Sequence, residues 1–236
     1  MPNLHHRSPE KELLDADNIP FEDIRQNMQE LNTVNRLLGG HAISCAGVEH
    51  FIKNSPATST LHICEIGCGG GDNLQALYER FHQKNIKPIF TGIDIKAACV
   101  DYAREQYPAL AASWLVNDYA NVSFDNGRPD IIFSSLFCHH FSDEQLIFML
   151  RWMRDNSRLG FFINDLQRHP LAYYSIKWIT KIFSRSYLVK NDAPLSVARA
   201  FTKKEWMRLL QQAGIKNYTI QWKWAFRYLV IFQHEQ

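Results

Sequence analysis

The sequence of 236 residues lacks any apolar run near the roughly 18 residues that a membrane-spanning helix needs. Its first residues, MPNLHHRSPEKELLDAD, are polar and contain no apolar segment of the kind found in signal peptides. The net charge is only +2, too small for the basic face of a nucleic-acid-binding domain. The five cysteines are irregularly spaced, so a disulfide framework is not expected. These absences favour a cytoplasmic protein that binds no nucleic acid.

Apolar residues make up 46% of the chain, which is enough for one sizeable α/β core with an extension. Residues 1 to about 10 are polar and are expected to be disordered. FEDIRQNMQELNTVNRLLGG has apolar residues at helical spacing and ends at a pair of glycines, so it predicts a helix, and a second helix is expected from Ile43 to Ile52. Asn54 to Thr60 is predicted to be a linker. We therefore expect a helical cap over residues 1–59 and the main domain over 60–236.

Strand and helix patterns alternate after the linker. The predicted strands are LHICEIG, PIFTGID, ASWLVND, RPDIIFSS and LGFFIND, and the helices between them are DNLQALYERFHQK, AACVDYAREQY and DEQLIFMLRWMRD. Such alternation is typical of βαβ units in a parallel sheet with helices on both faces. A helical block from about Pro170 to Ala200, a helix over 203–212 and a closing hairpin, NYTIQWKW and FRYLVIFQH, complete the chain.

The stretch LHICEIGCGGGDN holds the most informative motif. A glycine-rich turn after the first strand of such a sheet lets a ligand approach the backbone closely. The spacing Gly67-x-Gly69-x-Gly71 is followed by Asp72, whereas the dinucleotide motif requires one more glycine there and a site for pyrophosphate. The carboxylate of Glu65 suits a ligand with an ammonium or sulfonium group instead.

Two further acids follow the next two strands. Asp94 ends TGID, about 20 residues past the glycines, where a carboxylate accepts both ribose hydroxyls. Asp118 ends LVND and can reach an adenine amino group. The alternative for these residues is structural, a tight turn and a helix cap.

These elements in this order resemble the class I S-adenosylmethionine-dependent methyltransferases, over residues 60 to 236. The resemblance implies a Rossmann-like sheet of seven strands with an antiparallel last strand, and S-adenosyl-L-methionine as cofactor, with S-adenosyl-L-homocysteine as product. The cofactor-binding residues that it implies are Glu65, Gly67, Cys68, Gly69, Asp94, Ile95, Asn117, Asp118 and Ser134, with Arg36 for the methionine carboxylate.

Candidate catalytic residues follow the fourth and fifth strands. His139 and His140 lie in FCHHF, and a histidine at a strand end can act as a general base; Asp165 and His169 in FINDLQRHP are rivals. Packing or helix capping is the structural alternative for each of them. No metal site is expected, because the side chains of the adjacent Cys138, His139 and His140 should diverge.

The helical block from Pro170 to Ala200 is expected to be a lid insertion, over about 168–201. Leu171, Tyr174, Trp178 and Ile182 form one stripe, beside a basic stripe of Lys177, Lys181 and Arg185. The stripes indicate a core face beside a solvated face, a lid over an apolar substrate, or a helix resting on anionic lipid; we favour the lid. Tyr173, Tyr174 and Arg199 are expected to face the substrate, although Arg199 could instead pair with Asp192.

We therefore expect an enzyme that methylates a small, largely apolar acceptor, most simply a hydroxyl of an aromatic or polyketide-like metabolite. SSLF stands where N-methylating relatives carry an NPPY-like motif. C-methylation of a quinone-like ring, with weak membrane contact, is the alternative, and a non-catalytic cofactor-binding protein is the alternative of another class. A monomer and a homodimer remain equally open.

Overall fold

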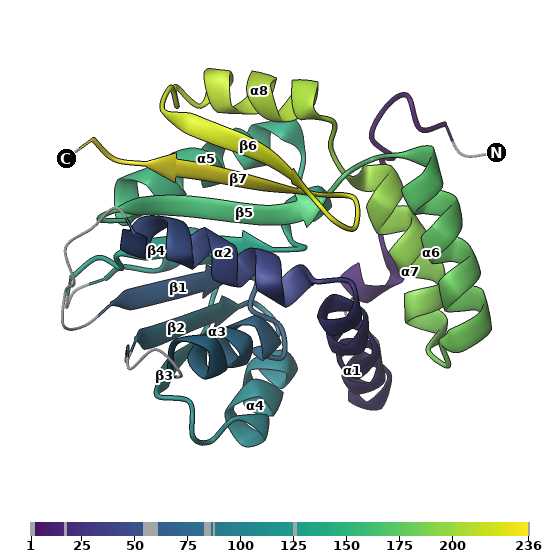
Figure 1. The fold of residues 1–236 in the computed structure, drawn as a ribbon. Coiled ribbons are helices and arrows are strands. Elements are labelled where there is room, and N and C mark those ends of the chain that lie inside the picture. Colours follow the sequence, from purple (N-terminus) through teal and green to yellow (C-terminus); the bar gives the residue numbers. More distant parts are fainter. Residues whose placement is uncertain are drawn as a thin grey trace.

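The computed structural model describes residues 3–16, 18–53, 61–82, 86, 88–124 and 127–235. Its centre is a seven-stranded sheet in the order β3-β2-β1-β4-β5-β7-β6 (Figure 1). Strands β1 to β5 run parallel, whereas β7 pairs antiparallel with both β5 and β6. The predicted Rossmann-like sheet and its closing hairpin are thus confirmed, while the predicted linker over Asn54–Thr60 lies outside the described residues.

The elements have the following bounds. The strands are β1 (His62–Ile66), β2 (Ile89–Asp94), β3 (Ala112–Val116), β4 (Ile131–Ser135), β5 (Gly160–Leu166), β6 (Tyr218–Lys223) and β7 (Arg227–Gln233). The α-helices are α1 (Phe21–Leu37), α2 (Gly40–Lys53), α3 (Asp72–His82), α4 (Ala97–Gln106), α5 (Asp143–Asn156), α6 (Pro170–Phe183), α7 (Tyr187–Arg199) and α8 (Lys203–Gln212). Short 3₁₀ turns are η1 (Leu13–Asp15), η2 (Tyr119–Asn121) and η3 (Cys138–His140).

Two apolar clusters hold helices against the sheet. One joins α2 and α3 to one face, where the rings of Phe133 and Phe162 stack 4.7 Å apart. The other joins α5 and α8 to the opposite face around the fully buried Trp206. Every residue of β4 is buried on both faces of the sheet. This agrees with its sequence, IIFSS, in which polar and apolar side chains do not alternate.

Local signals set where the helices around the carboxyl ends of the strands begin. Ser142 caps α5 in a capping box with Gln145, and Thr202 caps α8 in the same way with Glu205. Ser186 accepts a hydrogen bond from the backbone N–H of Val189 and so starts α7. The cap at Ser142 starts α5 directly after η3, which therefore forms a separate turn between β4 and α5.

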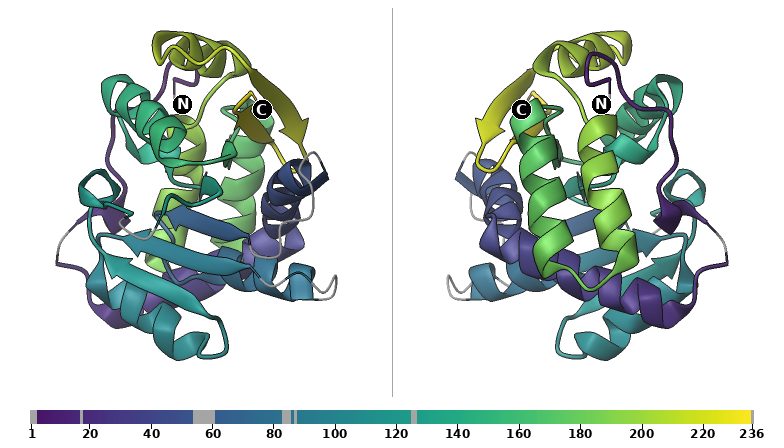
Figure 2. Two further views of the ribbon diagram at one scale, coloured as in Figure 1. Left: turned by 90° about the vertical axis from the view of Figure 1, so that its left-hand side faces the viewer. Right: turned by 90° about the vertical axis from the view of Figure 1, so that its right-hand side faces the viewer.

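The block from Pro170 to Ala200 consists of two helices. Figure 2 shows α6 and α7 side by side, beyond the carboxyl ends of the parallel strands. The stripe of Leu171, Tyr174, Trp178 and Ile182 is exposed, by 40% at Tyr174 and by 67% at Ile182. The stripe is therefore no core face, because α6 packs against α7 through other positions such as Ala172 and Thr180.

The N-terminal segment is more ordered than its composition predicts. The backbone N–H of Ser8 bonds the carbonyl of Ala198, and the guanidinium of Arg7 lies 4.3 Å from the ring centre of Phe201. Leu13 and Leu14 donate their backbone N–H groups to the carboxylate of Asp192. The expectation of disorder up to residue 10 was wrong for the described residues, because contacts to α7 satisfy this polar segment. Within the described ranges, no helix is long and apolar enough to cross a bilayer.

Candidate active site

A cavity of about 1090 Å³ opens along the carboxyl ends of the parallel strands. One end, here called the glycine end, is lined by Glu65, Gly67, Gly69, Asp94, Ile95 and Asp118. The other, the histidine end, is lined by Asp15, Phe137, His139, His140 and Arg199. Helix α1 closes the space between them with Ile24, Met28 and Leu31. The predicted cofactor-binding residues and the predicted catalytic histidines, which follow different strands in the sequence, therefore line the same cavity.

The backbone of the glycine loop turns toward the cavity. Gly69 has a φ of +48°, and a Cβ built there would meet no protein atom within 4 Å. Its N–H donates to the Asp94 carboxylate at 2.9 Å, which links the loop to the end of β2. A residue that is left-handed and open on its cavity side lets a ligand lie against the main chain. This geometry fits the cradle that the glycine spacing predicted.

Glu65 is buried, and one of its oxygens, Oε2, has no hydrogen-bond partner. Burial, reinforced by the negative charges of Asp72 and Asp94, raises the pKa of Glu65 well above that of an ordinary carboxyl, although a hydrogen bond with Asn73 acts in the opposite direction. An orphan carboxylate oxygen beside a cavity requires a cationic donor or a proton. Glu65 therefore fits a ligand that carries an ammonium group.

The carboxylates of Asp94 and Asp118, at the ends of β2 and β3, accept hydrogen bonds from the backbone and also border the cavity. Asp94 accepts from the N–H of Lys96 at 2.9 Å as well as from Gly69, and Asp118 accepts from the N–H of Ala120 at 2.9 Å. Asp118 therefore caps η2, whereas Asp94 holds the turn before α4, whose N-cap residue is Lys96. A carboxylate has about four lone-pair sites, so further acceptor capacity remains for ribose hydroxyls and an amino group. Ile95, which is 69% exposed, offers an apolar surface between them.

Three of the predicted cofactor residues lie elsewhere. Asn117 and Arg36 are exposed and do not line the cavity. Ser134 is fully buried, and its hydroxyl lies 3.4 Å from the sulfur of Cys138. Beside Arg36, the buried Asn35 lines the cavity instead and accepts a hydrogen bond from Arg227 at 2.8 Å.

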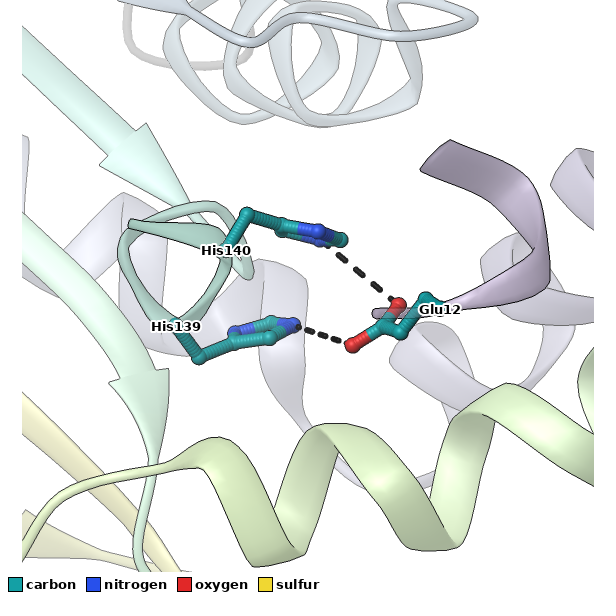
Figure 3. A group of neighbouring side chains, drawn as sticks. All are labelled: Glu12, His139 and His140. Atoms are coloured by element: carbon teal, nitrogen blue, oxygen red, sulfur yellow. Dashed lines mark ion pairs between the residues drawn. The ribbon is translucent and has the colours of Figure 1, made fainter. Parts of the chain in front are cut away.

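The histidine end brings two imidazoles and three carboxylates together. His139 Nδ1 lies 2.8 Å from Asp165 Oδ1, and His140 Nδ1 lies 3.0 Å from Asp15 Oδ1. The Nε2 atoms of both rings face Glu12 (Figure 3). The ring centres are 4.5 Å apart with planes inclined by 32°, so the expectation that adjacent side chains diverge here was wrong. In the 3₁₀ turn η3 both rings instead extend in the same direction.

Burial sets the protonation of the acids in this cluster. It raises the pKa of Glu12 to about 7, against the charge of His140 and a hydrogen bond from Ser196. Burial also acts to raise the pKa of Asp165, but the charge and the hydrogen bond of His139 outweigh it and hold that pKa below its ordinary value. Asp165 is thus an ionised partner that orients His139.

Arg199 holds the histidine end together. Its guanidinium donates to the carbonyls of His139 at 3.0 Å and His140 at 2.8 Å, and also to that of Glu10. All three nitrogens are engaged with the backbone, so the side chain clamps the N-terminal segment to η3.

The other predicted catalytic and substrate residues lie outside the cavity. His169 caps α6 by accepting from the N–H of Leu171, and its ring stacks on Phe226. Tyr173 lines a separate groove of about 780 Å³ between α6, α7 and the N-terminal segment, and Tyr174 is 40% exposed. The structure therefore supports the capping alternative for His169.

Several side chains of the cavity and of the histidine cluster beside it carry no local sequence signal. Glu12 and Asp15 lie in a polar segment whose pattern resembles any solvated run, and Asn35 and Asn73 lie within amphipathic helices. Leu136 has a φ of 52°, which is strained for a branched residue, and it borders the cavity directly after β4. The alternation of strands and helices indicates where these loops are but not how their backbones turn.

Comparison with known proteins agrees with this geometry. Residues 63–160 match a family described as a methyltransferase domain. A search of curated proteins finds no match.

Solved structures of methyltransferases share the fold. The plantazolicin methyltransferase BpumL in complex with SAH is 16% identical with a TM-score of 0.66, covering 90% of this chain and 88% of that one. Human N-acetylserotonin methyltransferase in complex with SAM is 15% identical with a TM-score of 0.66, covering 97% and 61%. Magnesium protoporphyrin IX methyltransferase from Synechocystis PCC 6803 is 13% identical with a TM-score of 0.55, covering 86% and 84%. The domain match, this fold and the glycine motif at its cavity together support a class I S-adenosylmethionine-dependent methyltransferase.

Proposed function

We propose that the protein transfers a methyl group from S-adenosylmethionine to a hydroxyl of a small, largely apolar acceptor. The observation that carries the proposal is the single cavity in which the glycine end and the histidine end face each other. When bound, S-adenosylmethionine supplies a methyl group on a positively charged sulfur. The protein's own contribution is to place an oxygen in line with that methyl group, at about 3 Å, and to accommodate the proton that the hydroxyl loses.

At the glycine end, each polar group has a counterpart in the cofactor. The unpartnered oxygen of Glu65 would accept the ammonium group, and the Asp94 carboxylate would accept the ribose hydroxyls. Asp118 would accept the adenine amino group beside the exposed side chain of Ile95. Gly69 leaves room for the cofactor chain to lie on the backbone, whereas the Phe137 ring packs against Gly67.

At the histidine end, apolar side chains would contact the body of the acceptor and polar side chains would bind its hydroxyl. Phe137, with Met28 and Leu31 of α1 between the two ends, offers an apolar wall, which suits an aromatic or polyketide-like body. His139 and His140 are the polar groups that converge on it, each held by a carboxylate, so an acceptor hydroxyl would bind against these rings. Enzymes of the same fold are named for plantazolicin, magnesium protoporphyrin IX and N-acetylserotonin, so the fold alone does not identify the acceptor.

Calorimetric titration with S-adenosylhomocysteine, with NAD as the control ligand, tests the cofactor assignment. Micromolar binding of the first and none of the second is the expected result. Turnover of a panel of phenols and enols, followed through S-adenosylhomocysteine release and mass spectrometry of the product, then tests the acceptor. A methyl group on carbon in every product would refute the assignment to a hydroxyl.

A second candidate acceptor, a membrane-soluble quinone-like ring methylated on carbon, is favoured by the surface of α6. Trp178 and Ile182 are exposed by 60% and 67%, next to the basic row of Lys177 and Lys181. No acidic residue occurs from 166 to 191, so this surface suits an anionic membrane.

Sedimentation with vesicles of anionic and of purely zwitterionic lipid tests this candidate. Binding to anionic vesicles that falls severalfold in Lys177→Gln/Lys181→Gln would support it. Equal recovery of the protein in the supernatant with both lipids would exclude the membrane-soluble acceptor and retain only the soluble one.

A further inference from the structure

The side chains of Glu12, His139 and His140 form a group that the methyl transfer alone does not explain. Glu12 comes from the N-terminal segment and both histidines from η3, and the three side chains point toward one another (Figure 3). One ligand atom from each lies within 4.8 Å of the other two. Glu12 and His139 are buried, while the His140 side chain is 20% exposed and lines the cavity.

The distances within this group are too long for hydrogen bonds. His139 Nε2 lies 3.5 Å from Glu12 Oε1, and His140 Nε2 lies 3.7 Å from Glu12 Oε2. An N–H···O hydrogen bond between imidazole and carboxylate spans about 2.7–3.2 Å. Two ligands of a tetrahedral zinc ion, each about 2.1 Å from the metal, lie about 3.4 Å apart. The spacing therefore suits atoms that share a cation.

The second nitrogen of each ring is already fixed by a carboxylate. Asp165 holds His139 Nδ1 at 2.8 Å, and Asp15 holds His140 Nδ1 at 3.0 Å. A ring that donates Nδ1–H to a carboxylate presents the lone pair of Nε2, and here two such lone pairs face one carboxylate. Metal-bound histidines show this arrangement, in which the outer carboxylate sets the tautomer and the ring orientation.

The charges around the rings also favour a cation. Glu12, Asp15 and Asp165 lie at the cluster, and Arg199 lies within 4.0 Å of Glu12 and 3.8 Å of Asp15. Metal binding requires the Nε2 atoms of both imidazoles deprotonated and Glu12 ionised, and in that form the three carboxylates outnumber Arg199 by two charges. The nearby Arg7 pairs with Asp143 at 2.9 Å, a carboxylate that Arg208 also contacts. A divalent cation would neutralise the excess in a place where burial makes it costly.

The group is also held in position. Arg199 and Arg7 donate to the carbonyls of η3, and Ser196 donates its hydroxyl to Glu12 Oε1 at 2.8 Å. Asp192 binds the backbone N–H groups of η1 directly after Glu12. A cation would therefore meet ligands that are already oriented.

We propose that Glu12, His139 and His140 bind one divalent transition-metal ion, with zinc the best match for two imidazoles and one carboxylate. Three protein ligands leave a fourth position, and the exposed side of His140 places it toward the cavity. The binding of the cation stands independently of the proposed function. That an acceptor oxygen occupies the fourth position rests on the proposed function; in that case the cation stabilises the deprotonated oxygen, and the two rings act as ligands.

Metal binding to the full-length protein tests the site directly. Protein treated with a chelator and then freed of it is titrated with Zn²⁺ by calorimetry, and with Co²⁺, whose visible absorption reports coordination number. We expect one Zn²⁺ per chain at micromolar affinity or tighter, and the intense absorption of four-coordinate Co²⁺. Absence of stoichiometric Zn²⁺ binding would show that the cluster consists of imidazolium–carboxylate pairs, and would overturn the proposal.

Variants locate the bound ion. Glu12→Gln and His140→Asn should each weaken Zn²⁺ binding at least a hundredfold, and Asp165→Asn, which removes an outer carboxylate, about ten- to a hundredfold. Glu10→Gln is the matched control, since the same change on an exposed side chain two positions away should leave the affinity unaltered. Unchanged Zn²⁺ binding in both Glu12→Gln and His140→Asn would overturn the proposal. S-adenosylhomocysteine binding by the same samples reports folding, and it tests the methyltransferase assignment separately.

Discussion

The glycine end of the cavity is built from short loops that follow neighbouring parallel strands, whereas the histidine end joins the N-terminal segment to η3, β5 and α7. At the glycine end, strand order alone brings Glu65, Asp94 and Asp118 together, because adjacent parallel strands end at the same edge. At the histidine end, the geometry depends on arginines that tie distant segments to carbonyl groups. The comparison teaches that the first end follows from the strand order, whereas the second depends on how the N-terminal segment docks.

A substitution of His140 should give the largest difference between the effect on turnover and the effect on cofactor affinity. His140→Ala should lower turnover by at least about a hundredfold, because it removes the polar group that faces the acceptor, and should leave S-adenosylhomocysteine affinity within a factor of two. Steady-state kinetics and calorimetry measure the two quantities. His169→Ala is the control, since its ring caps α6 outside the cavity. A parallel loss of cofactor affinity in His140→Ala would show that the two ends are one structural unit.

The clamp at Arg199 should show how the histidine end depends on long-range contacts. Arg199→Met removes three hydrogen bonds to buried or partly buried carbonyls and should cost about 2 kcal/mol, or about thirtyfold in the equilibrium that docks the N-terminal segment. Hydrogen exchange should then quicken at Ser8, whose N–H bonds α7, while the amides of β1 stay protected. Equal loss of protection in both places would mean that the N-terminal segment stabilises the whole domain.

At the glycine end, Asp94→Ala should weaken S-adenosylhomocysteine binding by at least tenfold. The change removes the proposed ribose contact and the hydrogen bond that holds the N–H of Gly69. Calorimetry measures the affinity, with Arg36→Ala as a control on an exposed side chain. Unaltered affinity in Asp94→Ala would place the ribose elsewhere.

The affinity for S-adenosylhomocysteine should also depend on pH through Glu65. The pKa of Glu65 is raised in the free protein, and an ammonium group beside it would favour the ionised form and lower that pKa on binding. Affinity should therefore be constant above the raised pKa and should fall by up to about tenfold per pH unit below it. Calorimetry across pH, with proton uptake measured in two buffers, checks the sign. Glu65→Gln should remove this dependence; an unchanged pH profile in that variant would exclude Glu65 as its source.

The features that could be predicted from the sequence are those that depend on contacts between residues close together in the chain. The strands, most helix boundaries and the closing hairpin were predicted because periodicity, caps and turns act over a few residues. The helix over 203–212 agrees to the residue, and its capping box is written in the sequence as TKKE. The exposed stripe on α6 could not be assigned to core or surface, since the same spacing describes both.

The sequence by itself determined the sheet, the glycine cradle and the three acids at its edge, because each lies within or directly after a strand whose place follows from local pattern. Only the tertiary structure decided that Glu12 meets His139 and His140, that Arg199 clamps the backbone, and that Arg36 and His169 stay outside the cavity. The physical reason is that these outcomes depend on how the N-terminal segment docks on α7 and η3. That docking is held by hydrogen bonds between residues far apart in the chain, for which no spacing in the sequence provides a signal.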